Sequence, residues 1–127
     1  MIAVRRVTMP VVHVVGVVVV ADGFVTAVIS DTDTGLHEAT ELLRALASPH
    51  RLAIVLALAD GPRCVHELVD SLAISQSLAS QHLRVLRGAG LVSTERRGRE
   101  IAYSLSDDHV AHIVNDAIIH AQERTNS

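Results

Sequence analysis

The sequence predicts a mainly α-helical domain with one small β-hairpin. Apolar residues recur at helical spacing through most of residues 36–123. The period changes once, over residues 91–106, to the alternation that is typical of strands. The chain has 127 residues, 49% of them apolar, which is the size and composition of one compact domain.

The first thirty residues differ in composition from the rest. They contain twelve valines, whereas the remaining ninety-seven residues contain seven. The longest uncharged run, residues 8–21, is too short for a transmembrane helix. Two arginines before a valine run resemble a secretory signal peptide, and a start codon assigned too far upstream is another explanation. We favour a poorly ordered, β-branched arm that leads into a polar linker, so that arm and linker together cover residues 1–35.

Four helices are predicted next. Residues 36–47 carry apolar groups at helical spacing, and Ser48 followed by Pro49 restarts the chain as an N-cap and first helical residue. The second helix ends at the Gly-Pro pair at 61–62. A third helix covers residues 65–73, and a fourth follows Ser75 and closes at residues 88–90.

The remaining elements are a hairpin and a last helix. Residues 91–97 and 100–106 alternate like strands and flank a basic tip around Gly98. Ser106 or Asp107 caps the final helix, and residues 124–127 form a short tail. Two helices joined by a short turn and followed by a hairpin form the winged helix-turn-helix arrangement.

The fourth helix has the residues of a recognition helix. Such a helix needs short polar groups near its N-terminus to reach base edges, and arginines to anchor phosphates. We expect its DNA-contacting residues, with those of the hairpin, to be Gln76, Ser77, Ser80, Gln81, Arg84, Arg97 and Arg99. Leu78, Ala79, Leu83 and Leu86 should face inward, and His82 is read as a packed or capping side chain.

Charge and cysteine content restrict the other function classes. The net charge is −3, but five arginines and one acid lie between residues 84 and 99, so the basic charge is local. The single cysteine, Cys64, excludes an internal disulfide and fits a cytoplasmic protein. The sequence has no His-Glu-x-x-His motif and no Gly-rich phosphate loop, so we expect no enzyme and no small-molecule substrate.

Residues 41–105 resemble the ArsR/SmtB family of metal-responsive repressors. The resemblance rests on "ELLRALASPHRLAIVLAL", "RCVHELVDSLAISQSLASQHLRVLRGAGLV" and "RRGREIAYSLS", and it extends over about residues 36–123. It implies a homodimeric winged-helix repressor that binds double-stranded operator DNA less tightly once an inducer binds. Some family members place paired thiols at the start of the third helix, but here His66 stands at the second thiol position, so Cys64 is read as a packed residue.

The final helix carries an unusual stripe of acids and histidines. Residues 109, 112, 116, 120 and 123 follow steps of three and four, so they share one helix face. A solvated polar face is the simpler explanation. His109 and His120 are eleven residues apart, or about 16 Å along a helix axis, so they cannot share a zinc ion within one chain.

An antiparallel copy of this helix changes the geometry. If a two-fold axis passes near residue 115, Asp107 and His109 of one chain lie opposite Glu123 and His120 of the other. The spacing resembles that of the intersubunit C-terminal-helix zinc site of the SmtB branch, and all four positions match. Asp108 is an alternative carboxylate, and His112 and Asp116 are candidates for outer contacts.

The ligand set indicates which metal is sensed. Two imidazoles and two carboxylates in four-coordinate geometry suit Zn(II), with Co(II) a close mimic, while Ni(II) prefers more ligands. We therefore expect a zinc-released repressor. The alternatives are a repressor of the same fold that responds to redox state or pH, or to Co(II) or Ni(II), and an oligomerisation module without DNA affinity.

Overall fold

The computed structural model describes residues 18–21, 24–27 and 31–127, and the chain divides into two units at Thr40 and Glu41. In the first unit, β1 (Val18–Ala21) and β2 (Phe24–Ala27) pair antiparallel, with Val18 opposite Ala27. The rest of the valine-rich arm, including its signal-like run, lies outside the described residues.

Helix α1 (Asp31–Leu46) starts earlier than the sequence indicated. Residues 31–35 were predicted to be a linker, and that prediction is wrong because they form the first turns of the helix. Acidic residues near a helix N-terminus are stabilised by the helix dipole, so this segment suits a first turn as well as a cap. The Thr40 hydroxyl donates to the carbonyl of Leu36 at 2.8 Å.

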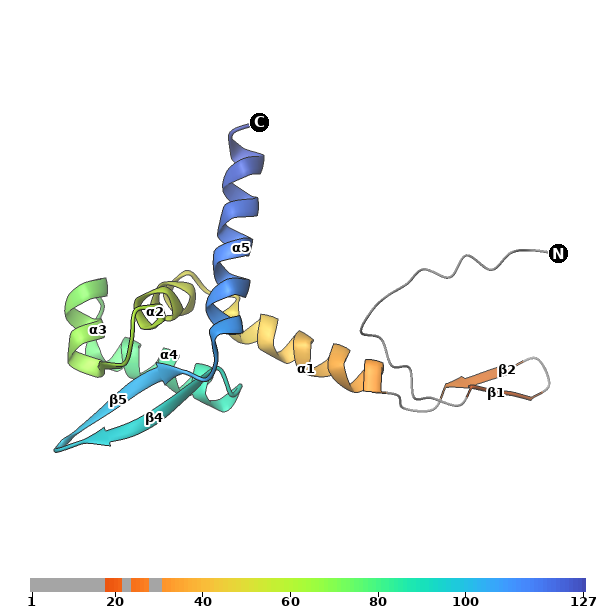
Figure 1. Ribbon diagram of the computed structural model, residues 1–127, viewed down its shortest axis with the longest axis horizontal. Coiled ribbons are helices and arrows are strands. Elements are labelled where there is room, and N and C mark those ends of the chain that lie inside the picture. Colours follow the sequence, from red (N-terminus) through yellow and green to blue (C-terminus); the bar gives the residue numbers. More distant parts are fainter. Residues whose placement is uncertain (1–17, 22–23, 28–30) are drawn as a thin grey trace. The chain divides into compact units, whose positions relative to one another are not determined.

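The second and third helices (Figure 1) begin at the residues that the sequence predicted, the second of them after its predicted serine cap. Ser48 caps α2 (Pro49–Ala59), and its hydroxyl accepts from the backbone N–H of Arg51 at 3.4 Å. Cys64 precedes α3 (Val65–Leu72), where the Glu67 carboxylate accepts from the Cys64 N–H at 2.6 Å. These bonds satisfy N–H groups that have no partner inside the helix.

Helix α4 (Gln76–Gly88) is closed at both ends. At its start the Ser75 hydroxyl accepts from the N–H of Leu78 at 3.1 Å. At its end the N–H of Leu91 donates to the carbonyl of Leu86 and the N–H of Gly90 donates to that of Arg87. This pair of bonds is the Schellman motif, which needs a left-handed residue, and Gly90 supplies it with φ +75°.

The wing is a three-stranded antiparallel sheet in the order β3-β5-β4. β4 (Val92–Arg97) and β5 (Glu100–Leu105) pair with Arg97 opposite Glu100. The hairpin turn places Gly98 at φ +61°, as the tight primed turns require at their first central position. β3 (Arg63–Cys64) adds to β5, with Cys64 opposite Ala102. The sequence did not predict β3, because two residues are too few to show an alternation.

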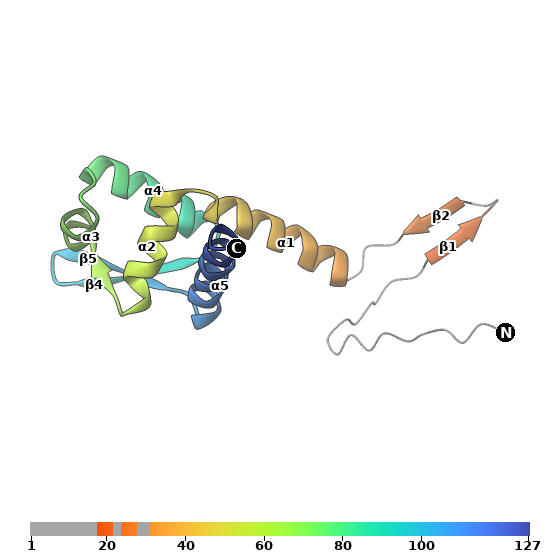
Figure 2. The same cartoon turned by 90° about the horizontal axis from the view of Figure 1, so that it is seen from above.

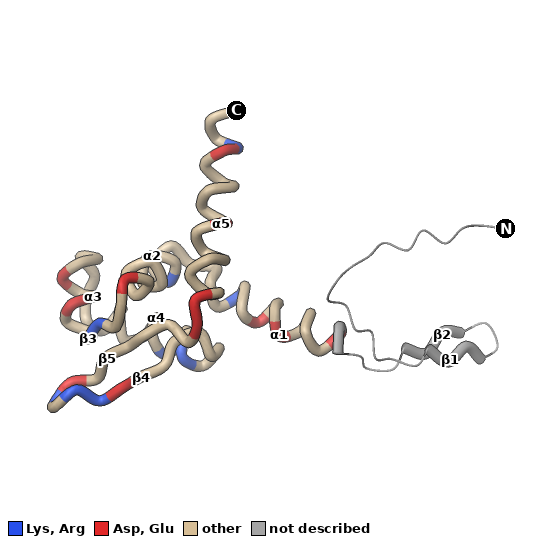
Figure 3. Tube along the Cα trace, viewed as in Figure 1, with Lys and Arg blue, Asp and Glu red and all other residues tan. Residues whose placement is uncertain are grey.

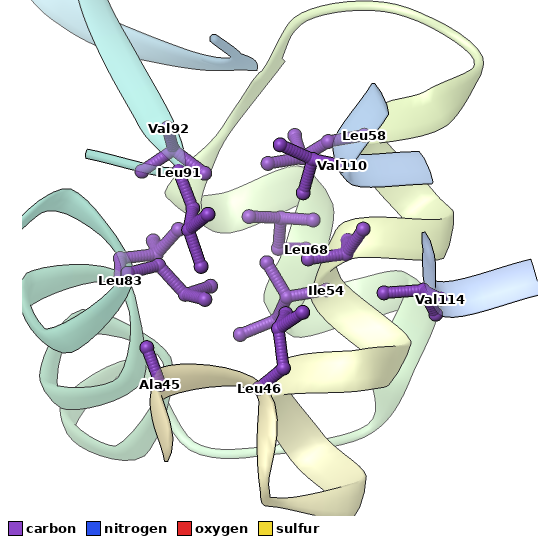
Figure 4. Close-up of a cluster of buried hydrophobic side chains, with 12 residues drawn as sticks. Ala45, Leu46, Ile54, Leu58, Leu68, Leu83, Leu91, Val92, Val110 and Val114 are labelled. Carbon is purple, nitrogen blue, oxygen red and sulfur yellow. The ribbon is translucent and has the colours of Figure 1, made fainter. Parts of the chain in front are cut away.

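The core of the second unit lies between the helices and the sheet (Figures 2 and 4). Ile54 and Val55 of α2, Leu68 of α3, and Leu83 and Leu86 of α4 are fully buried. Val110 and Val114 attach α5 (Asp108–Thr125) to this core, mainly against α2. The later part of α5 extends away from the core and is exposed apart from Ile118, which is half-buried (Figure 1).

Candidate nucleic-acid interface and metal site

Helix α4 turns its predicted contact residues outward. Gln76, Ser77, Gln81 and Arg84 are exposed and Ser80 is half-buried. The opposite face is buried at Ala79, Leu83 and Leu86 and half-buried at Leu78, as the sequence predicted. The helix therefore presents short polar groups on its first two turns with a cation beyond them, which is the arrangement that base and phosphate contacts need.

The wing tip carries the other cations (Figure 3). Arg96, Arg97 and Arg99 are all exposed around the Gly98 turn. The Nε of Arg96 donates to the carbonyl of Gly98 at 3.2 Å and holds this side chain against the turn. Glu100 beside them pairs with His66 of α3, Nδ1 to Oε1 at 3.1 Å. Arg97 and Arg99, the wing residues predicted to contact phosphate, are both exposed to solvent.

A hollow of about 330 Å³ lies between the wing and the starts of α3 and α4. Gln76 of α4 and Arg99 of the wing both line it, so two predicted DNA-contacting residues lie around one concavity. Cys64 also lines it but is buried, in agreement with its reading as a packed residue. Burial raises the pKa of the Cys64 thiol, and the Glu100 carboxylate raises it further. Burial and a raised pKa both fit a packed thiol rather than a reactive thiolate.

The predicted metal ligands lie at the two ends of α5, all of them exposed. Asp107 is the N-cap, and its Oδ1 accepts from the backbone N–H of His109 at 2.9 Å and of Val110 at 3.3 Å. The His109 ring is 86% exposed, with Nδ1 3.5 Å from the same oxygen. His120 and Glu123 lie near the other end. Across the described ranges, no group of three or more His, Cys, Asp or Glu side chains converges within this single chain.

His82 is packed, as the sequence indicated, and its neighbours were not foreseen. Its Nδ1 lies 3.3 Å from an Nη of Arg51, and its ring stacks on His50 with centroids 5.2 Å apart. Burial lowers the pKa of His82, and the charges of Arg51 and His50 lower it further. Arg51 lies in the first turn of α2, where a solvent-exposed cation is the usual interpretation, so no sequence signal identified this contact.

Comparison with known proteins agrees with this geometry. The model of the bacterial regulatory protein arsR family matches residues 48–94. The HTH-type transcriptional repressor SmtB of Mycobacterium tuberculosis is 60% identical over 88 residues, which is 69% of this chain and 65% of that protein. The chain thus spans just under two thirds of the length of this relative. The regulator NmtR of the same species is 48% identical over 80 residues, covering 63% of this chain and 67% of NmtR.

Solved structures show the same fold. The homodimeric winged helix-turn-helix DNA-binding domain of Mb0332 from Mycobacterium bovis, a possible ArsR-family regulator, superposes with a TM-score of 0.66. It is 29% identical, and the superposition covers 77% of this chain and 92% of that one. No single helix among the described residues is long and apolar enough to cross a membrane; the helices Asp33–Leu46 and Pro49–Ala59 reach that length and composition only when counted as one, and they are bent by 97° at the break between them. The fold, the exposed polar face of α4 and these relatives agree that the chain belongs to the arsR family of bacterial regulatory proteins.

Proposed function

We propose that the chain is a transcriptional repressor that binds double-stranded operator DNA as a homodimer and is released by Zn(II) bound between two α5 helices. DNA binding is supported by the exposed polar face of α4 and the arginines of the wing. A relative named as a repressor at 60% identity supports the regulatory role. A repressor works where the chromosome is, so we place it in the cytoplasm.

The observation that carries the metal proposal is the exposed stripe on α5. Asp107, His109, His120 and Glu123 offer oxygen and nitrogen donors to solvent, and the oxygen Oδ2 of Asp107 remains free after Oδ1 has capped the helix. The eleven-residue separation of the histidines corresponds to about 16 Å, which excludes one zinc ion held by both within a chain. Two antiparallel α5 helices would supply four donors at each of two identical sites.

The chemistry of the donors favours Zn(II). Four nitrogen and oxygen donors without a thiolate suit tetrahedral zinc, and Co(II) is the close substitute. Cys64 does not supplement them, because it is buried at the wing and its thiol pKa is raised. Metal that binds one dimer shape better than the other shifts the dimer toward that shape and changes its affinity for DNA.

A zinc titration of the protein on its own upstream DNA tests this function. A coupling of about 1–3 kcal/mol between metal and DNA weakens operator binding about 5- to 150-fold. His120→Ala should keep the metal-free operator affinity and lose the zinc response, because residue 120 lies on the exposed part of α5, away from α4. His37→Ala is a matched control, because it removes an exposed histidine from α1. Operator binding that is unchanged at saturating zinc excludes the metal switch and leaves a repressor that answers another signal, whereas no DNA binding at all excludes repression.

A mixed dimer tests whether the site is shared. In a heterodimer of a His109→Ala chain with a His120→Ala chain, one site loses both histidines and the other keeps all four ligands. Ligands drawn from a single chain would leave no intact site. One tight zinc ion per heterodimer is the expected result, and none contradicts the shared site.

A further inference from the structure

Arg51 of α2 contacts two other helices. Its Nε donates to the carbonyl of Ala45 at the end of α1, and one Nη lies 3.3 Å from Nδ1 of His82 on α4. The carbonyl of Ala45 is among those that a helix end leaves without an internal partner. One half-buried guanidinium therefore connects the C-terminal end of α1 to the middle of α4.

The contact determines the tautomer of His82. A guanidinium has only N–H donors, so Nδ1 must accept and the proton of the neutral ring must be on Nε2. Nε2 is buried and has no hydrogen-bond partner among the described residues. An unpartnered buried donor costs free energy, so an apolar side chain of similar size would be more stable here if His82 only filled space. The acceptor at Nδ1 is what an apolar side chain could not provide.

All the charges that face His82 oppose its protonation. The groups that face His82 are Arg51 and His50, both on α2, and neither is acidic. A proton added at Nδ1 would point at the Arg51 cation, and a charged His50 ring adds to the repulsion. The pKa of His82 is correspondingly lowered. The contact is therefore complete above the ordinary imidazole pKa and is lost as pH falls through the lowered value.

We propose that Arg51 and His82 are positioning residues that hold the recognition helix α4 against the ends of α1 and α2, and that protonation of His82 releases this hold. Neither residue touches DNA in this proposal, since the free ring nitrogen of His82 is buried. The exposed residues Gln81 and Arg84 flank His82 on the same helix turn, so a displacement at His82 moves them directly. The inference rests on the proposed DNA-binding function and adds to it a positioning contact that is sensitive to acid.

The decisive experiment measures operator affinity of the metal-free protein, with chelator present, at pH 7.5 and pH 5.5. His82→Asn keeps a side-chain acceptor near the position of Nδ1 and cannot be protonated, whereas His82→Phe keeps a ring and has no acceptor. From pH 7.5 to 5.5 the wild type should lose several-fold in affinity relative to His82→Asn, and less than about tenfold, because a pKa below the ordinary imidazole value leaves His82 only partly protonated at pH 5.5. His82→Phe should be weaker by a similar factor at both values, and Arg51→Met should behave in the same way.

The comparison is made against His82→Asn because any effect of pH on the other groups is common to the two proteins. Circular dichroism at both pH values ensures that only folded protein is compared. A wild type and a His82→Asn variant with parallel pH profiles would overturn the proposal while leaving DNA binding established. If the wild type bound no DNA even at pH 7.5, the proposed function would fail, and the inference with it.

A measurement on the unmutated chain tests the geometry independently of DNA. Imidazole nitrogen NMR of His82 at pH 7.5 should show the proton on Nε2, and the titration midpoint of His82 should lie below the ordinary imidazole value. Arg51→Met should move that midpoint upward, because it removes a neighbouring cation. A proton on Nδ1 would contradict the contact regardless of the DNA result.

Discussion

The Asp107 carboxylate has two roles, one observed and one proposed. Its Oδ1 caps α5, and the proposed function uses the same side chain to bind metal. Asparagine caps a helix as well as aspartate does but lacks the charge, so Asp107→Asn separates the roles. We expect both Asp107→Asn and Asp107→Ala to weaken zinc binding at least tenfold. Only Asp107→Ala should also lower the free energy of unfolding, by about 1 kcal/mol.

Zinc titration and chemical denaturation of the two variants measure these effects. If Asp107→Asn bound zinc as tightly as the wild type, Asp107 would not be a ligand. The carboxylate ligand would then be Asp108, which the sequence indicated as the alternative. Asp108→Asn is the matched variant, since Asp108 is exposed in the first turn of α5 and its change leaves the cap intact.

At single positions of the DNA interface, phosphate and base contacts differ in salt dependence. Arg84→Ala and Arg97→Ala should each weaken binding to every DNA sequence. Each change should also make the slope of log K against log salt shallower by about 0.9, the value for one phosphate contact. Gln81→Ala should change the preference among bases with little change in slope. Competition gel shifts over a range of salt concentrations check both. Slopes equal to that of the wild type in both arginine variants would remove these residues from the phosphate contacts.

Among the elements, α4 depends on its cap. Ser75→Ala removes the acceptor for the N–H of Leu78 and should cost about 1 kcal/mol of unfolding free energy. Ser77→Ala is the control, because Ser77 is exposed on the first turn and is not the cap. Ser77→Ala should leave the unfolding free energy within about 0.5 kcal/mol and weaken DNA binding. Equal destabilisation by the two changes would mean that the hydroxyl of Ser75 is not a functional cap.

Element boundaries show how far the sequence was informative. Ser48-Pro49, Ser75 and the Gly98 turn were readable, because each has a local physical cause that one residue type satisfies. The start of α1 and the strand β3 were not, since the first depended on polar residues that suit either a linker or a first turn. β3 exists only because β5 lies beside it.

For the site, the sequence predicted which side chains of α4 face solvent, but not which side chains from different elements lie together. The outward and inward residues of α4 followed from helical spacing, and His82, whose direction the spacing left less clear, was read as a packed or capping side chain. The contact between Arg51 and His82 joins residues thirty-one positions apart, and periodicity carries no information at that range. The stripe on α5 was readable as a set of donors, but their convergence depends on a second chain and stays a prediction.

For the molecule as a whole, the first thirty residues should be dispensable. Every residue of the buried core lies at or after Ala45, among the residues whose positions the structure describes. We expect a chain that starts at residue 31 to keep dimerisation, operator affinity and zinc response close to those of the full chain. Analytical ultracentrifugation, gel shifts and zinc titration of the two proteins test this. A truncated chain that stays monomeric would give the arm a structural role.

Helix α4 is stabilised by groups other than its predicted DNA-contacting residues. Its buried face, its serine cap and its Schellman closure hold the backbone, while Gln76, Ser77 and Gln81 contribute little to that stability. We therefore expect exchanges at these three exposed positions to alter sequence preference without a folding penalty. An engineered repressor could then receive a new set of DNA-contacting side chains on α4 and keep the rest of the domain unchanged.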